Sequence, residues 1–432
     1  MKRAHGGFTI EDSLDELAQL ARTAGLDVVG RAVQHLDRVY PATLIGKGKL
    51  EEIIASRAET PFDVILFDEE LRPNQQREIE KAFGGDDVEK SAPSALVKVL
   101  DRTALILDIF AQHARTKEGA LQVELAQYEY RLPRLTRMWT HLARQAGGAA
   151  GRGGTGGVGL RGPGERQLEL DRREIRTRIA HLKKLIEAVR VQRREHRRKR
   201  KREGLPVVAI VGYTNAGKST LLNALSGSDI LVEDKLFATL DPTTRRVKLP
   251  SGSEALFTDT VGFIHKLPTQ LVAAFRATLE EITEADLLLH VLDATHPNAR
   301  EQARAVEETL KEIGAGDKPM VIALNKMDKS AGDRGLGIRP SVTQDEFERD
   351  GNAVRISALK GQGLEELLPL VEKHIADEMI ELRVRIPYSA TELAALFHQR
   401  GIITREEFAE EGTIIEGKIA TSLVKRFTRY EI

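Results

Sequence analysis

The stretch Gly212–Thr220 reads G-Y-T-N-A-G-K-S-T and contains the residue types that point most directly to chemistry. Gly212 and Gly217 allow the backbone to curl so that its N–H groups face phosphate oxygens, and Lys218 adds a positive charge at the β- and γ-phosphates. Ser219 offers a hydroxyl to Mg²⁺ at a helix N-terminus, where the dipole also favours anions. We therefore predict a phosphate-binding loop, with a chance glycine turn as the alternative. Its predicted binding residues are Gly212, Tyr213, Thr214, Asn215, Ala216, Gly217, Lys218, Ser219 and Thr220.

Two later segments carry groups for the same phosphates and metal. The segment 237–244 contains Thr239, Thr243 and Thr244, and one of these hydroxyls can reach Mg²⁺ when a γ-phosphate is present. In the segment 259–262, D-T-V-G, the carboxylate can hold a Mg²⁺-bound water and the Gly262 amide can contact the γ-phosphate. We predict that Lys218 and Gly262 are catalytic. Lys218, together with Mg²⁺, stabilises the charge that develops on the β- and γ-phosphate oxygens, and the Gly262 amide contacts the γ-phosphate.

Two further motifs indicate which base is bound. In Asn325-Lys326-Met327-Asp328, the Asp328 carboxylate can accept both guanine N1–H and the exocyclic amine, a donor pair that adenine lacks. The backbone of Ser357-Ala358-Leu359 can contact guanine O6. All five motifs in this order predict a Mg²⁺-dependent enzyme that converts GTP to GDP and phosphate. The predicted nucleotide-binding residues outside the first loop are Phe237, Ala238, Thr239, Leu240, Asp241, Asp259, Thr260, Val261, Gly262, Asn325, Lys326, Met327, Asp328, Ser357, Ala358 and Leu359.

One expected catalytic group is missing. Phe263 follows Gly262, where Ras-type enzymes have the glutamine that orients the attacking water. Either another group performs this task, or turnover is slow until a partner completes the site. Asn215 resembles the asparagine that helps to coordinate a monovalent cation in translation and tRNA-modification GTPases, which suggests K⁺ as a second cofactor. A simple turn residue is the alternative at this position.

The elements that must position these motifs are visible in the sequence. Each motif except the threonine segment directly follows an apolar run that reads as a buried strand. These runs are 207–211, 255–257, 321–324 and 354–356. Doubly wound sheets bind ligands at the carboxyl ends of their strands. We therefore predict an α/β fold in which residues 204–378 form a P-loop GTPase domain with a mostly parallel sheet.

Residues 1–115 alternate between helical and strand-like patterns, which predicts a small α/β domain with a largely parallel sheet. Leu14, Leu17, Ala18 and Ala21 form the apolar face of a first helix. The other expected elements are strands at 28–29, 64–67 and 104–110, a helix after the turn at 43–49, and a helix at 74–83. The sequence G-K-G-K at 46–49 could bind phosphate or could be a basic turn that opens a helix.

Residues 116–203 predict a helical hairpin. We expect a helix over 119–145 that breaks at Pro133, a glycine-rich loop at 147–164, and a second helix from Glu165. The second helix carries a heptad seam of Leu168, Ile175, Ile179, Leu182, Ile186 and Val189. The loop is either a passive hinge or a segment that orders against RNA phosphates. The basic run at 193–202 is either a solvated face or a nucleic-acid contact.

The end of the chain predicts a separate small domain. A helix at 365–375 completes the nucleotide-binding domain. Residues 380–387 alternate as a half-buried strand does, and strand-like runs follow near Ile402 and Ile414. Between them we predict a helix at 391–399 that Ser389 caps. Residues 379–432 therefore predict a small α+β domain, for which a docking surface is the default interpretation.

Composition places limits on the function. The chain has 432 residues, 30% of them charged, a formal net charge of +0 and no cysteine. The lack of cysteine excludes disulfides, zinc–thiolate sites and thiol catalysis. The N-terminus shows no signal peptide, and no apolar run approaches the roughly 20 residues of a membrane span. We expect a cytoplasmic monomer without an integral membrane segment.

The chain resembles the HflX family of ribosome-associated GTPases from about residue 40 to 375. The segments that carry the resemblance are 101–103, 105–110, 121–127, 160–165, 168–173 and 237–241. The resemblance implies a cytoplasmic GTPase that binds ribosomal RNA and the large ribosomal subunit, with its N-terminal domain directed toward the peptidyl-transferase region, and that splits stalled or idle ribosomes under stress. It also favours Thr239 with Ser219 as the Mg²⁺ ligands.

Two other functions remain open at this stage. The protein could be a GTPase that assists ribosome assembly or RNA modification, in which case it would prefer immature particles or tRNA. It could also be a nucleotide-gated RNA-binding adaptor that does not catalyse hydrolysis, an alternative that the missing glutamine keeps open.

Overall fold

The computed structural model describes residues 7–85, 97–138, 163–202, 204–227, 236–237, 239–266, 276–331 and 351–432. The chain divides into two compact units. The first unit contains the described residues between Thr9 and Ala188. The second contains Gly7, Phe8 and the described residues from Val189 to Ile432. No helix in the described ranges is both long and apolar enough to cross a membrane.

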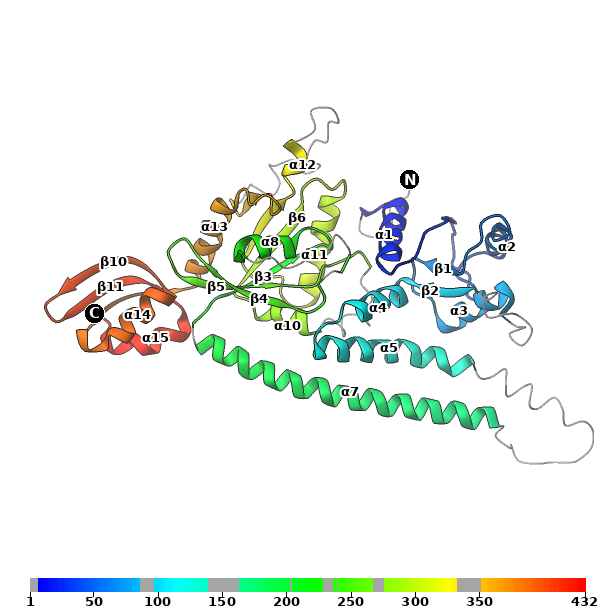
Figure 1. Ribbon diagram of the computed structural model, residues 1–432, viewed down its shortest axis with the longest axis horizontal. Coiled ribbons are helices and arrows are strands. Elements are labelled where there is room, and N and C mark those ends of the chain that lie inside the picture. Colours follow the sequence, from blue (N-terminus) through cyan, green and yellow to red (C-terminus); the bar gives the residue numbers. More distant parts are fainter. Residues whose placement is uncertain are drawn as a thin grey trace, which may run out of the picture. The chain divides into compact units, whose positions relative to one another are not determined.

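The first unit is built around two short parallel strands (Figure 1). Its elements are α1 (Ile10–Thr23), α2 (Lys47–Ser56), β1 (Val64–Phe67), α3 (Pro73–Glu80), a π-helical turn (Lys81–Gly85), β2 (Lys98–Asp101), α4 (Arg102–His113), α5 (Lys117–Met138) and most of α7 (Pro163–Arg202). Val64 of β1 is in register with Lys98 of β2, and Phe67 with Asp101. One core cluster joins Leu50 of α2 to both strands. The predicted α/β class of this part is therefore confirmed.

Two predicted strands of this unit are wrong. Residues 28–29 lie in a segment without regular structure, and residues 104–110 belong to helix α4. A short continuous apolar run fits a buried helix as well as a buried strand. The Asp101 side chain favours the helix, because it is the N-cap residue of α4 and accepts a hydrogen bond from the Ala104 amide at 2.8 Å. Residues 28–29 lack a neighbouring strand with which to pair among the described residues.

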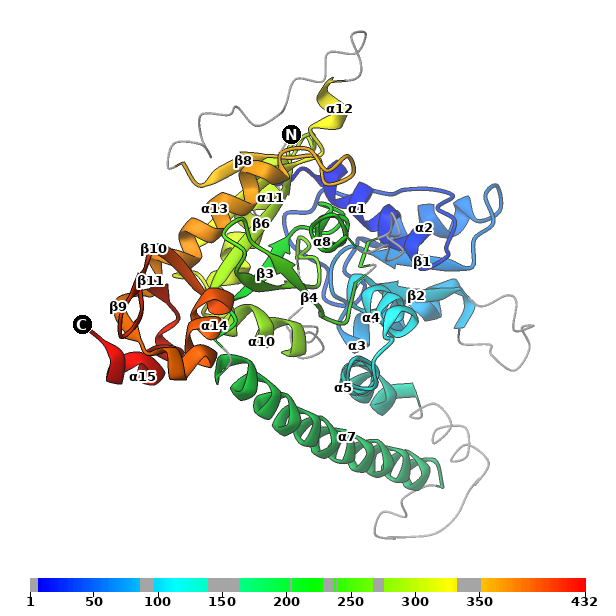
Figure 2. The ribbon, with the colours of Figure 1, turned by 60° about the vertical axis from the view of Figure 1, so that its left-hand side comes forward.

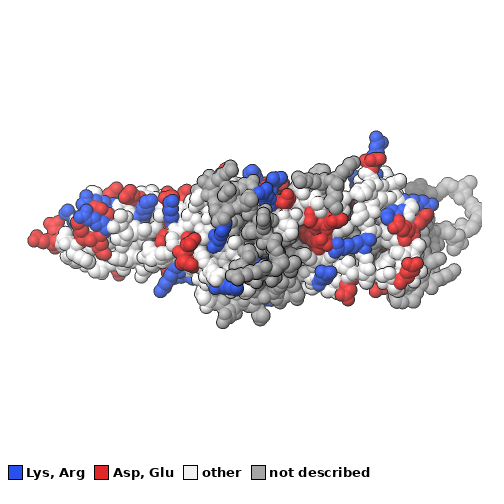
Figure 3. All heavy atoms as spheres, turned by 90° about the horizontal axis from the view of Figure 1, so that it is seen from above, with Lys and Arg blue, Asp and Glu red and all other residues white. Residues whose placement is uncertain are grey.

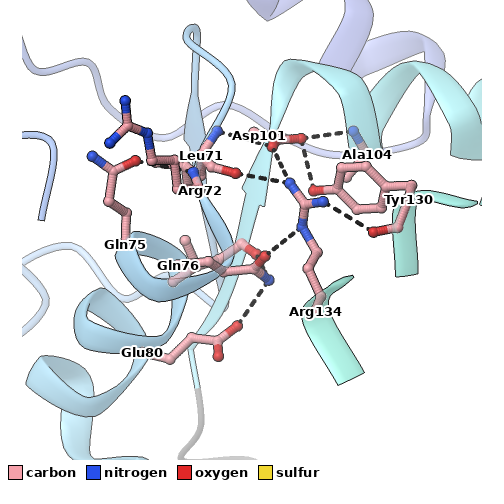
Figure 4. Close-up of polar contacts among 10 residues, drawn as sticks. Leu71, Arg72, Gln75, Gln76, Glu80, Asp101, Ala104, Tyr130 and Arg134 are labelled. Atoms are coloured by element: carbon pink, nitrogen blue, oxygen red, sulfur yellow. Dashed lines mark hydrogen bonds and ion pairs between the residues drawn. The ribbon is translucent and has the colours of Figure 1, made fainter. Parts of the chain in front are cut away.

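Helix α5 continues through Pro133, where we predicted a break. The Arg134 side chain, which follows the proline, anchors this part of the helix (Figure 4). Its guanidinium donates to the Leu71 carbonyl at 2.8 Å and forms an ion pair with Asp101 at 3.1 Å. The Tyr130 hydroxyl donates to the same carboxylate at 2.9 Å. These contacts tie α5 to the end of β2 and compensate for the hydrogen bond that a proline cannot donate.

Helix α7 contains the predicted heptad seam. Leu182 is buried, while Ile175, Ile179, Ile186 and Val189 are half-buried, so the seam is the packed side of the helix. Leu168 lies in α7, but its side chain is outside the described part of the structure. Of the predicted glycine-rich loop 147–164, residues 147–162 are outside the described residues. Ion pairs join α7 to α5 at Arg178–Glu124, 2.7 Å, and at Lys183–Glu129, 2.9 Å.

The second unit is centred on a six-stranded sheet of order β4-β5-β3-β6-β7-β8. Its strands and helices are β3 (Val207–Gly212), α8 (Lys218–Ser226), β4 (Thr243–Lys248), β5 (Glu254–Asp259), α10 (Arg276–Glu284), β6 (Leu287–Asp293), α11 (Ala299–Glu312), β7 (Met320–Asn325), α12 (Asp328–Ala331), β8 (Ala353–Arg355) and α13 (Leu364–Asp377). All neighbouring strands are parallel except β4, which runs antiparallel to β5.

Helices cover both faces of this sheet (Figure 2). Val321 of β7 packs in one core cluster with Leu221 of α8 and Leu367 of α13. Ile322, the next residue, packs in another cluster with Ala303 of α11. Successive strand residues point to opposite faces, so α8 and α13 lie on one face and α11 on the other. The predicted doubly wound, mostly parallel sheet is confirmed.

A small α+β part completes the second unit, as predicted. Its elements are β9 (Ile380–Ile386), a 3₁₀ turn (Tyr388–Ala390), α14 (Thr391–Arg400), β10 (Gly401–Ala409), β11 (Gly412–Ile419), α15 (Thr421–Phe427) and a second 3₁₀ turn (Thr428–Tyr430). The strands are antiparallel in the order β10-β11-β9. The rings of Phe397 and Phe427 meet edge to face at 5.3 Å in its core. Ser389 lies in the first 3₁₀ turn and does not cap α14, whose N-cap residue is Ala390.

Candidate nucleotide-binding site

The loop between β3 and α8 has a backbone that requires its glycines. Gly212 has φ +151°, and a Cβ there would lie 2.3 Å from the Val291 carbonyl oxygen. Gly217 has φ +97°, and a Cβ there would lie 2.3 Å from the Asn325 side-chain nitrogen. Asn215 also adopts a left-handed conformation, with φ +59°. Since a side chain at either glycine would displace a strand or a loop, these residues permit the close approach that a phosphate cradle needs.

The Lys218 side chain is turned inward over this loop. It is 6% exposed, and its ammonium donates to the Tyr213 carbonyl at 2.8 Å and to the Gly212 carbonyl at 3.2 Å. Burial lowers the pKa of Lys218 to about 8, against the attraction of Asp259. A buried cation without a full counter-charge gains strongly from an arriving phosphate.

Three oxygen-bearing side chains converge at the start of α8. The Ser219 hydroxyl donates to Asp259 at 2.7 Å and lies 2.8 Å from the Thr239 hydroxyl. Burial raises the pKa of Asp259, while Lys218 and hydrogen bonds oppose that rise. The second Asp259 carboxylate oxygen, Oδ1, is buried and has no hydrogen-bond partner among the described residues. This set of hard oxygen donors fits Mg²⁺.

The structure distinguishes the three candidate threonines. Thr243 and Thr244 both belong to β4, whereas Thr239 precedes that strand. The Thr244 hydroxyl is paired with the Thr258 hydroxyl of β5 at 2.9 Å. Only Thr239 of the three therefore has a described contact with Ser219.

The segment after β5 lies directly against the phosphate-binding loop. The Thr214 amide donates to the Phe263 carbonyl at 2.8 Å, and the Phe263 amide donates to the Gly212 carbonyl at 3.1 Å. A Cβ at Gly262 would lie 2.7 Å from the Thr214 methyl and 3.0 Å from the Lys218 ammonium, so only glycine fits without displacement. The Phe263 side chain is 2% exposed and apolar, which agrees with its inability to orient water.

The Asn325–Asp328 segment joins the loop to the base-recognition region. The Asn325 side chain donates to the Ala216 carbonyl at 2.9 Å and accepts from the Ala358 amide at 2.9 Å. The Asp328 carboxylate accepts a hydrogen bond from the Ser357 hydroxyl at 2.6 Å. Asn325 therefore connects the two regions, while Ser357 orients the carboxylate that we predict to contact guanine.

The remaining predicted residues lie around this centre. Phe237 and Leu240, the large apolar side chains of the threonine segment, are buried, at 2% and 5% exposed. Leu359 is 76% exposed, so only its backbone can serve the base. The Tyr213 hydroxyl accepts a hydrogen bond from the His265 amide at 2.7 Å. Thr260 and Val261 are buried, and the half-buried residues are Thr220, Asp241 and Met327. Ala238 lies outside the described residues.

Sequence reasoning missed Asp293 at the end of β6. Its carboxylate forms an ion pair with Lys326 at 2.8 Å, and Lys326 also donates to the Asn215 carbonyl at 2.7 Å. Although burial raises the pKa of Asp293, Lys326 and Thr295 lower it below its ordinary value. The available signal was its position after the apolar run of β6, at the same sheet edge as the other motifs.

Sequence reasoning also missed His290 in the middle of β6. The side chain is 1% exposed, and neither ring nitrogen has a hydrogen-bond partner among the described residues. Burial, and to a smaller extent Lys218, lower the pKa of His290 to about 4. The unfolded chain, with an ordinary histidine pKa near 6.5, therefore binds more protons than the folded chain between about pH 4 and 6.5.

This difference predicts an acid sensitivity. As pH falls from 6.5 to 4, His290 should cost the folded state of the second unit about 3 kcal/mol, since each pKa unit corresponds to about 1.4 kcal/mol. The variant His290→Leu should lose less stability over this range. Urea unfolding at a series of pH values would measure the difference between the two proteins, and parallel curves for both would contradict the prediction. The exposed His35→Leu substitution is the control and should follow the wild-type curve.

Family profiles match most of the chain. Residues 11–111 match a profile described as GTP-binding GTPase N-terminal, and residues 113–200 match GTP-binding GTPase Middle Region. Residues 207–326 match 50S ribosome-binding GTPase, and residues 341–428 match HflX C-terminal domain.

Curated relatives match this chain over nearly its whole length. A GTPase HflX of Caldanaerobacter subterraneus subsp. tengcongensis is 44% identical over 422 residues, which cover 98% of this chain and 91% of the relative. A GTPase HflX of Escherichia coli K12 is 40% identical over 403 residues, which cover 93% and 88%. A GTP-binding protein of Sulfolobus solfataricus, solved with GDP, is 26% identical and covers 84% of this chain and 95% of that chain at a TM-score of 0.41.

Proposed function

Because the chain belongs to the HflX family of GTPases, we propose that it hydrolyses GTP with Mg²⁺. We also propose that the bound nucleotide controls its affinity for the large ribosomal subunit. The observation that carries this proposal is the meeting of Lys218, the Ser219–Thr239–Asp259 cluster and Gly262 around one loop. GTP and GDP are the nucleotides that the Asp328 carboxylate favours.

The proposed chemistry follows from these contacts. When bound, Mg²⁺ would supply positive charge at the β- and γ-phosphate oxygens, with Ser219 and Thr239 as its protein ligands and Asp259 holding a metal-bound water. Lys218 would exchange its two backbone carbonyl partners for phosphate oxygens and stabilise the charge that develops during transfer. The Gly262 amide would contact the γ-phosphate, which links the segment after β5 to the nucleotide state.

The γ-phosphate gives this site the means to act as a switch. Thr239 and Gly262 lie in two separate segments, and both would contact the γ-phosphate or its metal. Loss of the γ-phosphate would release both segments at once. We propose that this release lowers the affinity for the ribosome, and that GTP-dependent binding splits or rescues stalled ribosomes.

Ribosomal RNA is the polyanion that the charge distribution suits best. The basic run 193–202 ends α7, and the described side chains Arg194 and Arg198 are exposed. The face drawn in Figure 3 mixes basic and acidic side chains among its described atoms, so it is less suited to a polyanion than this run. The description of the profile that matches residues 207–326, a 50S ribosome-binding GTPase, supports the same partner.

Phosphate release with purified subunits tests this function. Large subunits should stimulate phosphate release in a Mg²⁺ and KCl buffer, and small subunits should not. Pelleting through sucrose should show tighter binding to large subunits with a non-hydrolysable GTP analogue than with GDP. Equal binding in both nucleotide states would contradict the switch, and preferential binding to immature particles would favour a role in assembly. GTP binding without stimulated phosphate release would favour the non-catalytic adaptor.

We propose K⁺ as a second cofactor at the exposed edge of the loop. Asn215 is exposed, and its carbonyl already accepts a hydrogen bond from Lys326 at 2.7 Å, so the backbone there is fixed. A cation held by the Asn215 side chain would add positive charge near the phosphates, whereas the apolar Phe263 side chain contributes no polar group to the site. Turnover should be faster in KCl than in NaCl at equal ionic strength, and Asn215→Ala should remove the difference. Identical wild-type rates in the two salts would refute this role.

We further propose that four parts, 1–115, 116–203, 204–378 and 379–432, act together in a cytoplasmic monomer. The nucleotide state set in 204–378 would be transmitted to the RNA-binding surfaces of 116–203. Light scattering of the purified protein would test the monomeric state.

A further inference from the structure

Lys326 and Asn215 share an uncommon backbone conformation. Their φ angles are +67° and +59°, in the left-handed region that residues other than glycine adopt at a cost in free energy. The Lys326 ammonium donates to the Asn215 carbonyl at 2.7 Å, so the two residues are joined directly. Backbone strain of this kind is concentrated at ligand-binding sites and persists where the surrounding contacts enforce it. The contacts that hold Lys326 are therefore part of what shapes this site.

The Asp293 carboxylate determines where the Lys326 ammonium lies. Strands β6 and β7 are parallel neighbours, and Asp293 at the end of β6 is in register with Asn325 at the end of β7. Asp293 therefore lies beside the start of the Asn325–Asp328 segment. Its Oδ2 atom forms an ion pair with the Lys326 ammonium at 2.8 Å. The two side chains are only 13% and 19% exposed, so water and salt screen this attraction less than they would at the surface.

The other oxygen of the Asp293 carboxylate is held by its own loop. Oδ1 accepts hydrogen bonds from the Thr295 amide at 3.0 Å and from the Thr295 hydroxyl at 2.7 Å. An aspartate that accepts from the backbone two residues further along stabilises the turn that it begins. These two bonds fix the orientation of the carboxylate, so that Oδ2 is preorganised for a cation. Asp293 thus joins the turn after β6 to Lys326 with one oxygen for each.

Lys326 connects two parts of the site that would contact opposite ends of a nucleotide. It stands two residues before Asp328, the predicted base contact, and its ammonium reaches Asn215 in the predicted phosphate-binding loop. An ammonium that lost its carboxylate partner would be better solvated in bulk water. The Lys326 side chain would then leave the Asn215 carbonyl, and both left-handed residues would relax. Nucleotide binding would have to order both segments again, which lowers the affinity.

We propose that Asp293 is a positioning residue for guanine nucleotides, which holds Lys326 against the phosphate-binding loop and so keeps that loop and the Asn325–Asp328 segment ready to bind. This inference rests on the proposed GTP site and adds to it a residue that acts through Lys326. The residues predicted to respond to the γ-phosphate are Thr239 and Gly262. Asp293 should therefore matter equally for GTP and GDP, and it should affect binding more than the rate of hydrolysis.

The Asp293→Asn variant of the full-length protein tests this role, because asparagine keeps an oxygen for Thr295 but removes the charge that holds Lys326. It should bind GTP and GDP at least about tenfold more weakly, by equal factors, as expected for the loss of a charged, mostly buried contact. Inosine triphosphate, which lacks the exocyclic amine, should lose affinity by the same factor, because Asp328 still recognises the base. The single-turnover rate at saturating GTP should change less than about twofold. Titration with fluorescent nucleotides and phosphate release measure these quantities.

A double-mutant cycle separates positioning from a general structural effect. Lys326→Met keeps the aliphatic stem but lacks the ammonium, so Asp293→Asn should cost less than about twofold in affinity in that background. Thr295→Val, which removes one of the two hydrogen bonds to Oδ1, should weaken GTP and GDP binding equally. The exposed Asp317→Asn substitution is the control and should bind both as the wild type does.

The outcomes also separate this role from the proposed GTP site. A loss of affinity by Asp293→Asn that is as large in the Lys326→Met background as in the wild type would overturn the positioning role. A fall in the single-turnover rate of Asp293→Asn as large as its loss of affinity would overturn it as well. If the wild type binds GTP and GDP and Asp293→Asn binds them equally well, only the role of Asp293 fails. If the wild type binds neither nucleotide, the proposed GTP site fails with it.

Discussion

The Lys218→Ala variant hydrolyses GTP at least about a thousandfold more slowly than the wild type, the upper end of the loss seen when one preorganised charge donor is removed. Lys218 is buried beside the loop, and within the described residues its ammonium donates to two backbone carbonyls and is attracted by the Asp259 carboxylate. A phosphate would complete that balance, and alanine offers neither the charge nor the hydrogen bonds. Single-turnover phosphate release at saturating GTP and Mg²⁺ measures the loss.

A matched variant separates this loss from general damage. Lys373→Ala removes an exposed lysine from α13 of the same domain and should hydrolyse GTP at the wild-type rate. Thermal unfolding should show that Lys218→Ala remains folded, because the substitution removes a buried charge. Wild-type turnover by a folded Lys218→Ala protein would refute the proposed role.

The Asp328→Asn variant binds GTP about a hundredfold more weakly than the wild type, a loss of about 2–3 kcal/mol for a buried donor left unpaired. The Ser357 hydroxyl orients the Asp328 carboxylate, whose oxygens can accept guanine N1–H and the exocyclic amine. An asparagine amide has one acceptor and one donor group. It therefore matches xanthine, which presents N1–H beside a carbonyl oxygen. Titration with fluorescent nucleotides measures both affinities.

Xanthosine triphosphate provides the internal control. The Asp328→Asn variant should bind it more tightly than the wild type does, which a misfolded site could not achieve. Asp317→Asn, a change of the same kind at an exposed position after α11, should leave both affinities unchanged. If Asp328→Asn bound GTP as tightly as the wild type does, residues other than Asp328 would have to recognise the guanine base.

The family and the fold class could be predicted because their signals are local. Gly212, Gly217 and Lys218 stand at fixed spacing after a strand, and the later motifs follow further apolar runs. Since the carboxyl ends of parallel strands meet at one edge of a sheet, the order of these runs was sufficient to place the motifs together. Neither the fold class nor the family required knowledge of a single side-chain contact.

Contacts between distant residues decided the rest. The residue types alone leave Thr239, Thr243 and Thr244 as candidates, and only the family resemblance favours Thr239. In the structure, the pairing of β4 with β5 places the Thr244 hydroxyl against Thr258, while the Thr239 hydroxyl lies beside Ser219. Residues 104–110 became a helix through the Asp101 cap, which the apolar run alone does not reveal. Residues 28–29 have strand composition but no paired neighbour among the described residues. Short-range patterns determine which elements can form, whereas packing and pairing across the chain determine which of them do, because each such contact must offset the conformational entropy of ordering both partners.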